Sequence, residues 1–305
     1  MEKDALKEEI LRLKKDKNAV ILAHYYQIDD IQQIADIRGD SLALAIEASK
    51  IDCDIIVFCG VKFMAETAKV VSPDKKVLLP VEDAGCPLAD MATKDAVLKR
   101  KEELGDVAVV SYVNTNVDVK TVSDYCCTSA NAVNVVKQIK EDRVLFVPDR
   151  NLGGYVKEQV GEKEIYLWDG FCPTHEEFNL DALLKAKKEH PSAKVAVHPE
   201  SPKAVRDAAD FVGSTSGIIS YVENTDADEF IIGTEEGILF ELKKRNPNKK
   251  FYIISGKSVC TNMKKITLEK LYESLKFERY EIVLDDDTIQ KAKKPIQKMM
   301  EIKRN

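Results

Sequence analysis

The sequence lacks several patterns that would place it in a familiar class of protein. No apolar run in its 305 residues approaches the length of about 18 that predicts a membrane-spanning helix. The net charge is −6 and lysine and arginine are spread along the chain, which excludes the basic patch of a nucleic-acid-binding protein. The N-terminal segment MEKDALKEEILRLKKDKN is charged and has no apolar signal-peptide core. The sequence therefore predicts a cytoplasmic protein.

Common catalytic motifs are also missing. No G-x-G-x-x-G follows a predicted strand, and SGKS at 255–258 lacks the earlier glycine of a phosphate loop because Phe251 occupies that position. HEEF at 175–178 is not the zinc motif H-E-x-x-H, and the cysteines form no C-x-x-x-C-x-x-C cluster. These absences argue against nucleotide binding, metalloprotease chemistry and radical chemistry of that kind.

The chain does contain seven cysteines and enough apolar residues, 44%, to fill the cores of two or three domains. Cysteines in a cytoplasmic protein are not expected to pair as disulfides, which leaves burial, metal binding or catalysis. Four of them are predicted to be structural: Cys53, Cys59, Cys126 and Cys127. A redox role for the adjacent pair is the alternative.

Nine short apolar runs alternate with amphipathic helical stretches. The runs are 19–26, 54–60, 75–81, 107–114, 143–149, 163–169, 193–200, 229–234 and 249–256. Most are continuous and rich in β-branched and aromatic residues, as expected of strands buried on both faces. The alternation predicts an α/β fold class with parallel sheets in three-layer αβα, Rossmann-like domains.

The nine runs fall into three groups that share two further features. A short motif that ends in hydroxyl residues starts at Asp36, Asp124 and Asp210, at intervals of 88 and 86 residues. A cysteine follows each aspartate after 50, 48 and 50 residues. Chance would explain similar strand spacing, but it would not easily place both features in step three times.

The sequence therefore predicts a threefold repeat of about 87 residues, with pseudo-symmetric domains around a central site. The expected bounds are 1–103 with the N-terminal helix, 104–190, 191–284, and 285–305 as a C-terminal helix on the first repeat.

The repeated cysteines, Cys86, Cys172 and Cys260, would meet at the pseudo-threefold axis. Three soft ligands suit zinc or an iron–sulfur cluster. A structural zinc site normally needs a fourth protein ligand, and the repeat supplies three. One coordination position would stay open, and in a 4Fe–4S cluster one iron would then be free to act as a Lewis acid.

His175 offers a second interpretation, because it follows Cys172 by three residues and could close a zinc site. The other repeats carry Ala89 and Met263 at that position, so the symmetry does not require a fourth ligand. Three unrelated cysteines are the remaining alternative.

Polar clusters follow the first strand of each group, where α/β folds place ligands. They supply His24 and Tyr26, then Tyr112 and Asn114, then His198 and Glu200. The hydroxyls of Ser41, Ser129, Ser214 and Thr215 precede helical stretches, whose N-termini bind anions. Ordinary N-capping is the alternative, but three such motifs beside a metal predict a pocket for a substrate with several anionic groups.

Short motifs spread in order along nearly the whole chain resemble the quinolinate synthase family. They are AHYYQ, GDSL, FMAET, GCPLAD, YVNT, CTSANAV, PDRNLG, GFCPTH, HPE, GST and VCTNMK. The resemblance implies an enzyme of de novo NAD biosynthesis that condenses iminoaspartate with dihydroxyacetone phosphate to quinolinate, phosphate and two waters. It implies one 4Fe–4S cluster per chain on Cys86, Cys172 and Cys260, and contact with the enzyme that supplies iminoaspartate.

The same resemblance implies roles for the polar residues. His24, Ser41 and Ser129 would hold substrate carboxylate and phosphate, and Asn114, Ser214 and Thr215 would position the intermediate. Tyr26, Tyr112, His198 and Glu200 would transfer protons. Tyr112, His198 and Glu200 would also contact substrate. Two other functions stay open: an iron–sulfur hydro-lyase that acts on a hydroxy-dicarboxylate, and a non-enzymatic scaffold stabilised by zinc.

Overall fold

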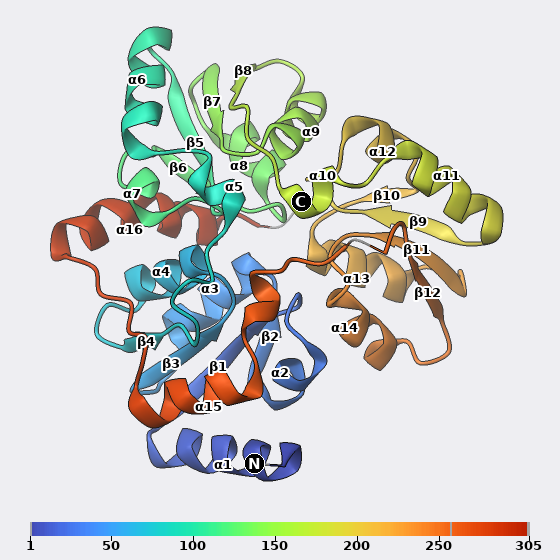
Figure 1. Ribbon diagram of the computed structural model, residues 1–305. Coiled ribbons are helices and arrows are strands. Elements are labelled where there is room, and N and C mark those ends of the chain that lie inside the picture. Colours follow the sequence, from blue (N-terminus) through green and yellow to red (C-terminus); the bar gives the residue numbers. More distant parts are fainter. Residues whose placement is uncertain (1, 257, 304–305) are drawn as a thin grey trace.

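Three four-stranded parallel sheets, each flanked by helices, make up the computed structural model, which describes residues 2–256 and 258–303 (Figure 1). Lys257 of the SGKS segment lies outside the described residues. The predicted α/β class with three αβα units is confirmed. No helix in the described part of the chain is long and apolar enough to cross a membrane.

The strands have the same order in all three sheets. The first sheet runs β2 (Ile37–Gly39), β1 (Ala19–His24), β3 (Ile55–Cys59) and β4 (Lys76–Leu78). The second runs β6 (Tyr125–Cys127), β5 (Ala108–Tyr112), β7 (Arg143–Val147) and β8 (Glu164–Leu167). The third runs β10 (Phe211–Val212), β9 (Lys194–Val197), β11 (Glu229–Gly233) and β12 (Lys250–Ile253). A threefold repeat accounts for this identity.

Sequence analysis found nine of these strands and missed the edge strands β2, β6 and β10. Each missed strand has only two or three residues and lies inside one of the short aspartate motifs. A segment of that length shows no hydrophobic period, so its pairing becomes visible only in the folded sheet.

Helices connect and cover the strands. In the first half of the chain they are α1 (Lys3–Asp16), α2 (Asp29–Ile34), α3 (Ser41–Lys50), α4 (Lys62–Val71), α5 (Pro87–Asp90), α6 (Lys94–Leu104), α7 (Val117–Lys120) and α8 (Ala132–Gln138). Then follow α9 (Arg150–Val160), α10 (Pro173–Glu176), α11 (Leu180–Glu189), α12 (Lys203–Asp207), α13 (Thr215–Asn224), α14 (Ile238–Arg245), η1 (Met263–Lys265), α15 (Leu268–Phe277) and α16 (Asp286–Glu301).

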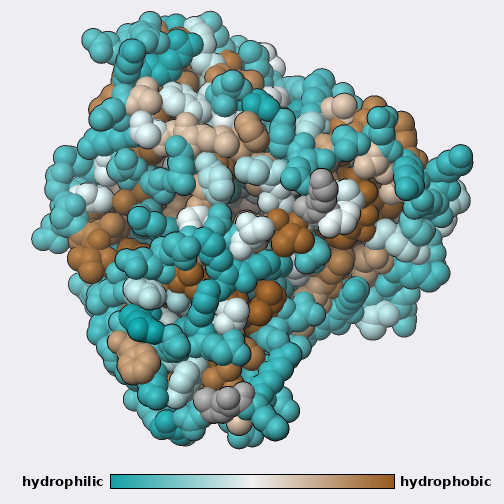
Figure 2. Space-filling model, in the orientation of Figure 1, coloured by the Kyte–Doolittle hydropathy of each residue, from teal (hydrophilic) through white to brown (hydrophobic). Residues whose placement is uncertain are grey.

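Inner strands form the apolar cores. Strands β3 and β5 are buried at every position, as expected of parallel strands covered by helices on both faces. Hydrophilic residues dominate the face of the molecule in Figure 2, and the apolar residues on it lie in separate groups.

The repeated aspartates Asp36, Asp124 and Asp210 hold the edge strands in place. Their carboxylates accept hydrogen bonds at 2.8 Å from the backbone N–H groups of Ile21, Val109 and Val195 on the neighbouring strands. Their own N–H groups donate to the carbonyls of the same three residues at 3.0, 3.0 and 2.9 Å. A lysine pairs with each carboxylate. The aspartate of the repeated motif therefore has a structural role. We call each such aspartate a bracket, because its hydrogen bonds join the edge strand to the neighbouring strand.

The C-terminal part of the chain returns to the first sheet. Helix α15 packs on α1 and β3, and the following segment pairs with the first sheet through Leu79 N–H to Tyr280 O at 2.9 Å and Ile282 N–H to Val77 O at 2.8 Å. Helix α16 packs on α4 of the first unit and on β6 and α7 of the second. These segments fasten the units to one another.

Removing one bracket tests its contribution to stability. We expect Asp124→Ala to lower the free energy of unfolding by about 1–3 kcal/mol, because the N–H of Val109 loses its acceptor. Lys101→Ala removes only a partly exposed ion pair and should cost less than about 1 kcal/mol. Denaturant titration followed by circular dichroism measures both. Equal losses in the two variants would contradict a role for the backbone hydrogen bond.

Candidate functional site

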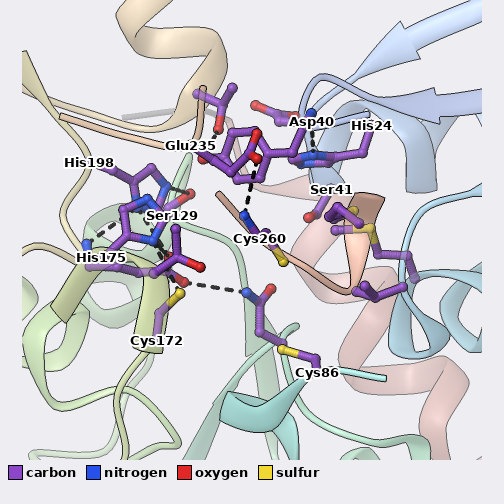
Figure 3. A pocket seen from close by; sticks show the side chains of 18 of the residues that line it. His24, Asp40, Ser41, Cys86, Ser129, Cys172, His175, His198, Glu235 and Cys260 are labelled. Atoms are coloured by element: carbon purple, nitrogen blue, oxygen red, sulfur yellow. Dashed lines mark hydrogen bonds and ion pairs between the residues drawn. The ribbon is translucent and has the colours of Figure 1, made fainter. Parts of the chain in front are cut away.

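The polar strand ends of all three units face one buried cavity of about 70 Å³ (Figure 3). It is lined by twelve of the thirteen residues singled out from the sequence: His24, Tyr26, Ser41, Cys86, Tyr112, Asn114, Ser129, Cys172, His198, Glu200, Thr215 and Cys260. Ser214 lines an adjacent groove and caps helix α13 by accepting a hydrogen bond from Gly217 N–H at 3.1 Å. The structure therefore brings the sequence-derived set together with one exception.

Each cysteine of the site stands at the start of a short helical turn. Cys86 and Cys172 are the N-caps of α5 and α10, and a proline follows each of them, where its fixed φ suits the first turn. Cys260 precedes η1 by three residues. Backbone N–H groups of these turns hydrogen-bond the three sulfur atoms. The turns thus place each sulfur atom at the cavity, together with the backbone N–H groups that bind it.

The three thiols are not ready to ionise on their own. Burial is the main cause that raises the pKa of Cys86, to about 12, and it also raises the pKa values of Cys172 and Cys260. The proximity of the cysteines to one another adds to the rise for Cys86 and Cys172. A bound metal centre supplies the positive charge that three thiolates need.

These donors fit an iron–sulfur cluster with three cysteine ligands. The sulfurs come from three units, line one cavity and receive backbone N–H bonds. No fourth cysteine is among the cavity-lining residues that the structure describes, because Cys53, Cys59, Cys126 and Cys127 lie elsewhere. A 4Fe–4S cluster held by these three cysteines would therefore have one position for a group that is not a cysteine.

His175, whose role the sequence left open, lies inside the site. Its Nδ1 is 2.8 Å from a carboxylate oxygen of Glu200 and 3.2 Å from the sulfur of Cys172, and its Nε2 is 2.9 Å from the hydroxyl of Thr234. Cys172, His175 and Glu200 have potential ligand atoms within 4.8 Å of one another, so they could also hold a single metal ion. That arrangement would leave Cys86 and Cys260 without a role.

The two strand-end histidines occupy matched positions and are both neutral. Nδ1 of His24 accepts the N–H of Tyr26 at 3.1 Å, and Nδ1 of His198 accepts the N–H of Glu200 at 3.3 Å. Burial lowers the pKa of His24 to about 4 and that of His198 to about 3. The proton of each ring then lies on Nε2, which in His198 is 3.1 Å from the hydroxyl of Ser129. Both rings are hydrogen-bond donors without a net charge.

Glu200 is the centre of the polar network. Its carboxylate contacts His175, accepts a hydrogen bond from Asn114 at 3.3 Å and is hydrogen-bonded to the hydroxyl of Tyr112. Burial opposes ionisation of Glu200, but the contacts with His175 and the hydrogen bond from Tyr112 outweigh it and lower the pKa of this carboxyl. Glu200 is therefore a carboxylate that can accept a proton.

Two tyrosines, Tyr26 and Tyr112, also line the cavity. The hydroxyl of Tyr26 is 2.9 Å from Thr215 Oγ1 and 2.6 Å from Thr234 Oγ1. Burial is the main cause that raises the pKa values of Tyr26 and Tyr112. Both phenols stay protonated and can act as acids.

Sequence analysis did not name four polar residues of this region: Asp40, Asp149, Thr234 and Glu235. Asp40 lines the cavity and caps α3, and Glu235 lines it beside Cys260. Thr234 joins Tyr26 to His175. A usable signal existed for three of them, because Asp149, Thr234 and Glu235 follow β7 and β11 at the same sheet edge as the named residues.

The fold and site define an α/β enzyme in which three similar units meet at a buried, thiol-lined cavity. The family model described as quinolinate synthetase A protein matches residues 8–301. A curated quinolinate synthase of Alkaliphilus metalliredigens is 54% identical, with 97% of this chain and 98% of the relative covered. One of Caldicellulosiruptor saccharolyticus is 52% identical, with 99% and 100% covered. The chain belongs to the quinolinate synthetase A protein family.

The neutral histidines make stability depend on pH in a defined direction. The pKa of His24 is about 4 in the folded chain and 6.5 for a free histidine, so only the unfolded chain binds this proton as the pH falls below 6.5. The contribution of the neutral His24 ring to stability is complete above pH 6.5 and is lost as the pH falls towards 4. When the pH falls from 6.5 to 5, the free energy of unfolding should decrease by about 1–2 kcal/mol less in His24→Gln than in the parent.

Denaturant titrations at several pH values measure this difference. The matched control is His190→Gln, which removes a histidine that stacks on Tyr252 and does not line the cavity. A His24→Gln variant whose stability falls with pH as steeply as that of the parent would show that the ring is not held neutral.

Proposed function

We propose that this chain condenses iminoaspartate with dihydroxyacetone phosphate to quinolinate, phosphate and two waters in the central cavity. Quinolinate synthase function in NAD biosynthesis follows from family membership. The substrates, the cluster and the roles of individual residues are our proposal. The observation that carries it is the convergence of Cys86, Cys172 and Cys260 from three units beside neutral histidines and an ionised glutamate.

In this proposal Cys86, Cys172 and Cys260 bind one 4Fe–4S cluster. When bound, the cluster supplies an iron with an open coordination position that acts as a Lewis acid on substrate oxygen. The backbone N–H groups at the three sulfurs stabilise the thiolate form of the ligands. Burial of the site keeps bulk water away from reactive imine and enol species.

The anionic groups of the substrates are bound by neutral donors. His24 and His198 offer Nε2–H groups, and the hydroxyls of Ser41 and Ser129 lie on the cavity wall. Thr215 is the first residue of α13, so its hydroxyl lies at a helix N-terminus that favours negative charge. These residues suit carboxylate and phosphate. Ser214 contributes by holding this helix end, since its hydroxyl caps α13.

Proton transfer is assigned to the network around Glu200. The shifted pKa values leave Glu200 ionised and the phenols of Tyr26 and Tyr112 protonated in the resting site, so Glu200 is our candidate proton acceptor and the two phenols are our candidate proton donors to leaving hydroxyl groups. Asn114 orients Glu200 by its hydrogen bond and lies where it can position the intermediate. The ring of His198 links the backbone N–H of Glu200 to the hydroxyl of Ser129.

We also propose a cytoplasmic location and contact with the enzyme that supplies iminoaspartate, because a free imine hydrolyses in water. The division into repeats 1–103, 104–190 and 191–284 with a C-terminal helix 285–305 is likewise proposed. The repeated sheet order supports it, while residues 268–284, at the end of the third repeat, pack against the first unit.

Metal analysis with cysteine variants tests the cluster. After anaerobic reconstitution we expect the parent to be brown and to contain about four irons and four sulfides per chain. Cys86→Ser, Cys172→Ser and Cys260→Ser should each lose most of this iron, because each removes a thiolate ligand. Cys53→Ser is the control, since this cysteine lies outside the cavity. One zinc and no iron in the parent would instead favour the group of Cys172, His175 and Glu200, or a zinc-stabilised scaffold.

Turnover separates the enzyme classes and tests the proton acceptor. The parent given both substrates anaerobically should form a product with pyridine absorbance, whereas dehydration of a hydroxy-dicarboxylate alone would favour the hydro-lyase.

Glu200→Gln should lower kcat by about 100-fold or more with unchanged iron content, because the amide cannot accept the proton. An iron-loaded Glu200→Gln variant with parental kcat would remove Glu200 from the mechanism.

A further inference from the structure

The three cysteine loops, residues 84–86, 170–172 and 258–260, are attached to their sheets by one repeated hydrogen bond. The backbone N–H three residues after strands β3, β7 and β11 donates to the carbonyl two residues before the cysteine. The pairs are Lys62 to Ala84, Arg150 to Gly170 and Glu236 to Ser258, each at 2.8 Å. The repeat therefore builds the same backbone connection three times.

The residue before each of these donors breaks the symmetry. It is Val61 in the first unit, Asp149 in the second and Glu235 in the third. Asp149 accepts a hydrogen bond from the N–H of Cys172 at 3.1 Å, and Glu235 accepts one from the N–H of Cys260 at 3.1 Å, which is drawn in Figure 3. Val61 has no side-chain acceptor for a loop. Two of the three cysteine loops are thus held by a carboxylate.

Each carboxylate uses its second oxygen to hold the chain beyond the strand. Asp149 Oδ1 accepts from Leu152 N–H at 2.7 Å, and Glu235 Oε2 accepts from Gly237 N–H at 2.7 Å. One planar carboxylate therefore joins the backbone of the cysteine to the chain that follows the strand. In the second unit the approach is so close that a Cβ on Gly170 would lie 2.3 Å from the carbonyl oxygen of Pro148.

The first unit serves as an internal comparison. It forms the same backbone connection with an apolar residue, so the fold of this turn does not need a carboxylate. Both Asp149 and Glu235 are 0% exposed, and a buried carboxylate is costly unless hydrogen bonds satisfy it. The hydrogen bonds that satisfy these two groups include the N–H of a cysteine. The two carboxylates therefore serve the cysteine loops and not the backbone connection that all three units share.

We propose that Asp149 and Glu235 are positioning residues for the metal centre. Each carboxylate fixes the backbone of one ligand, Cys172 or Cys260, and so sets the direction in which its thiolate points into the cavity. This inference rests on the proposed cluster. It assigns a role beyond the ligands themselves, since groups that orient metal ligands contribute strongly to metal affinity.

Two substitutions remove the acceptor and keep the shape. In Asp149→Asn and Glu235→Gln an NH₂ group replaces one carboxylate oxygen, so one of the two backbone N–H groups loses its partner. Glu235→Gln also removes the ion pair between Glu235 and Lys264 Nζ at 2.9 Å. Asparagine is a good N-cap, and α9 therefore keeps its start while Cys172 loses its acceptor.

Matched controls exist in the same chain. Asp285→Asn makes the same exchange at the N-cap of α16, away from the cavity. Glu241→Gln alters a buried carboxylate of the third unit that pairs with Arg38 and Arg245 and does not contact a cysteine loop.

The readouts are iron release to a chelator, the EPR spectrum of the reduced cluster and the unfolding midpoint of the iron-loaded protein. We expect Asp149→Asn and Glu235→Gln to release iron about 10- to 100-fold faster than the parent and to show altered g values. Asp285→Asn and Glu241→Gln should keep the parental release rate and spectrum, even where their unfolding midpoints fall.

Three results would overturn the inference. An iron-loaded parent whose Asp149→Asn and Glu235→Gln variants keep its release rate and g values would overturn the positioning role alone. Faster iron release in the two control variants to the same extent would reduce the effect to general stability, with the same consequence. A parent that takes up no iron would overturn the cluster first and the positioning role with it.

Discussion

The meeting of three buried sulfur atoms at one cavity is the constraint on which the rest of this structure depends. A single loop could place several cysteines by local turn geometry, but Cys86, Cys172 and Cys260 belong to three separate sheets. Their relative positions are set by the packing of whole units, which α15 and α16 fasten together. Burial also raises the pKa values of the thiols, so ligand ionisation and metal binding must occur together.

Chemical function in this fold lies where the repeat is broken. The repeat supplies the sheets, the aspartate brackets and the cysteine turns three times. The strand ends differ: His24 and His198 accept a backbone N–H and present a neutral donor, while Tyr112 occupies the matched place in the second unit with a protonated phenol. These differences line one cavity with a different polar group from each unit.

Much of the fold and the site was predictable because both depend on periodic features. Buried strands show as apolar runs, and a repeated cysteine shows as a constant interval, so Cys86, Cys172 and Cys260 could be singled out together. The edge strands β2, β6 and β10 were missed because two or three residues carry no period. His175 and Thr234 have no counterpart with the same side chain in the other repeats, so the interval argument could not assign them a place.

The sequence by itself determined the α/β class, the threefold repeat and the residue types that reach the central cavity, because these follow from patterns along the chain. Tertiary structure decided what each of those residues does. The tautomers of His24 and His198, the ionised state of Glu200 and the contact of His175 with Cys172 all depend on groups from distant segments. Distances and burial between such segments set pKa values and hydrogen bonds, and no interval along one chain encodes them.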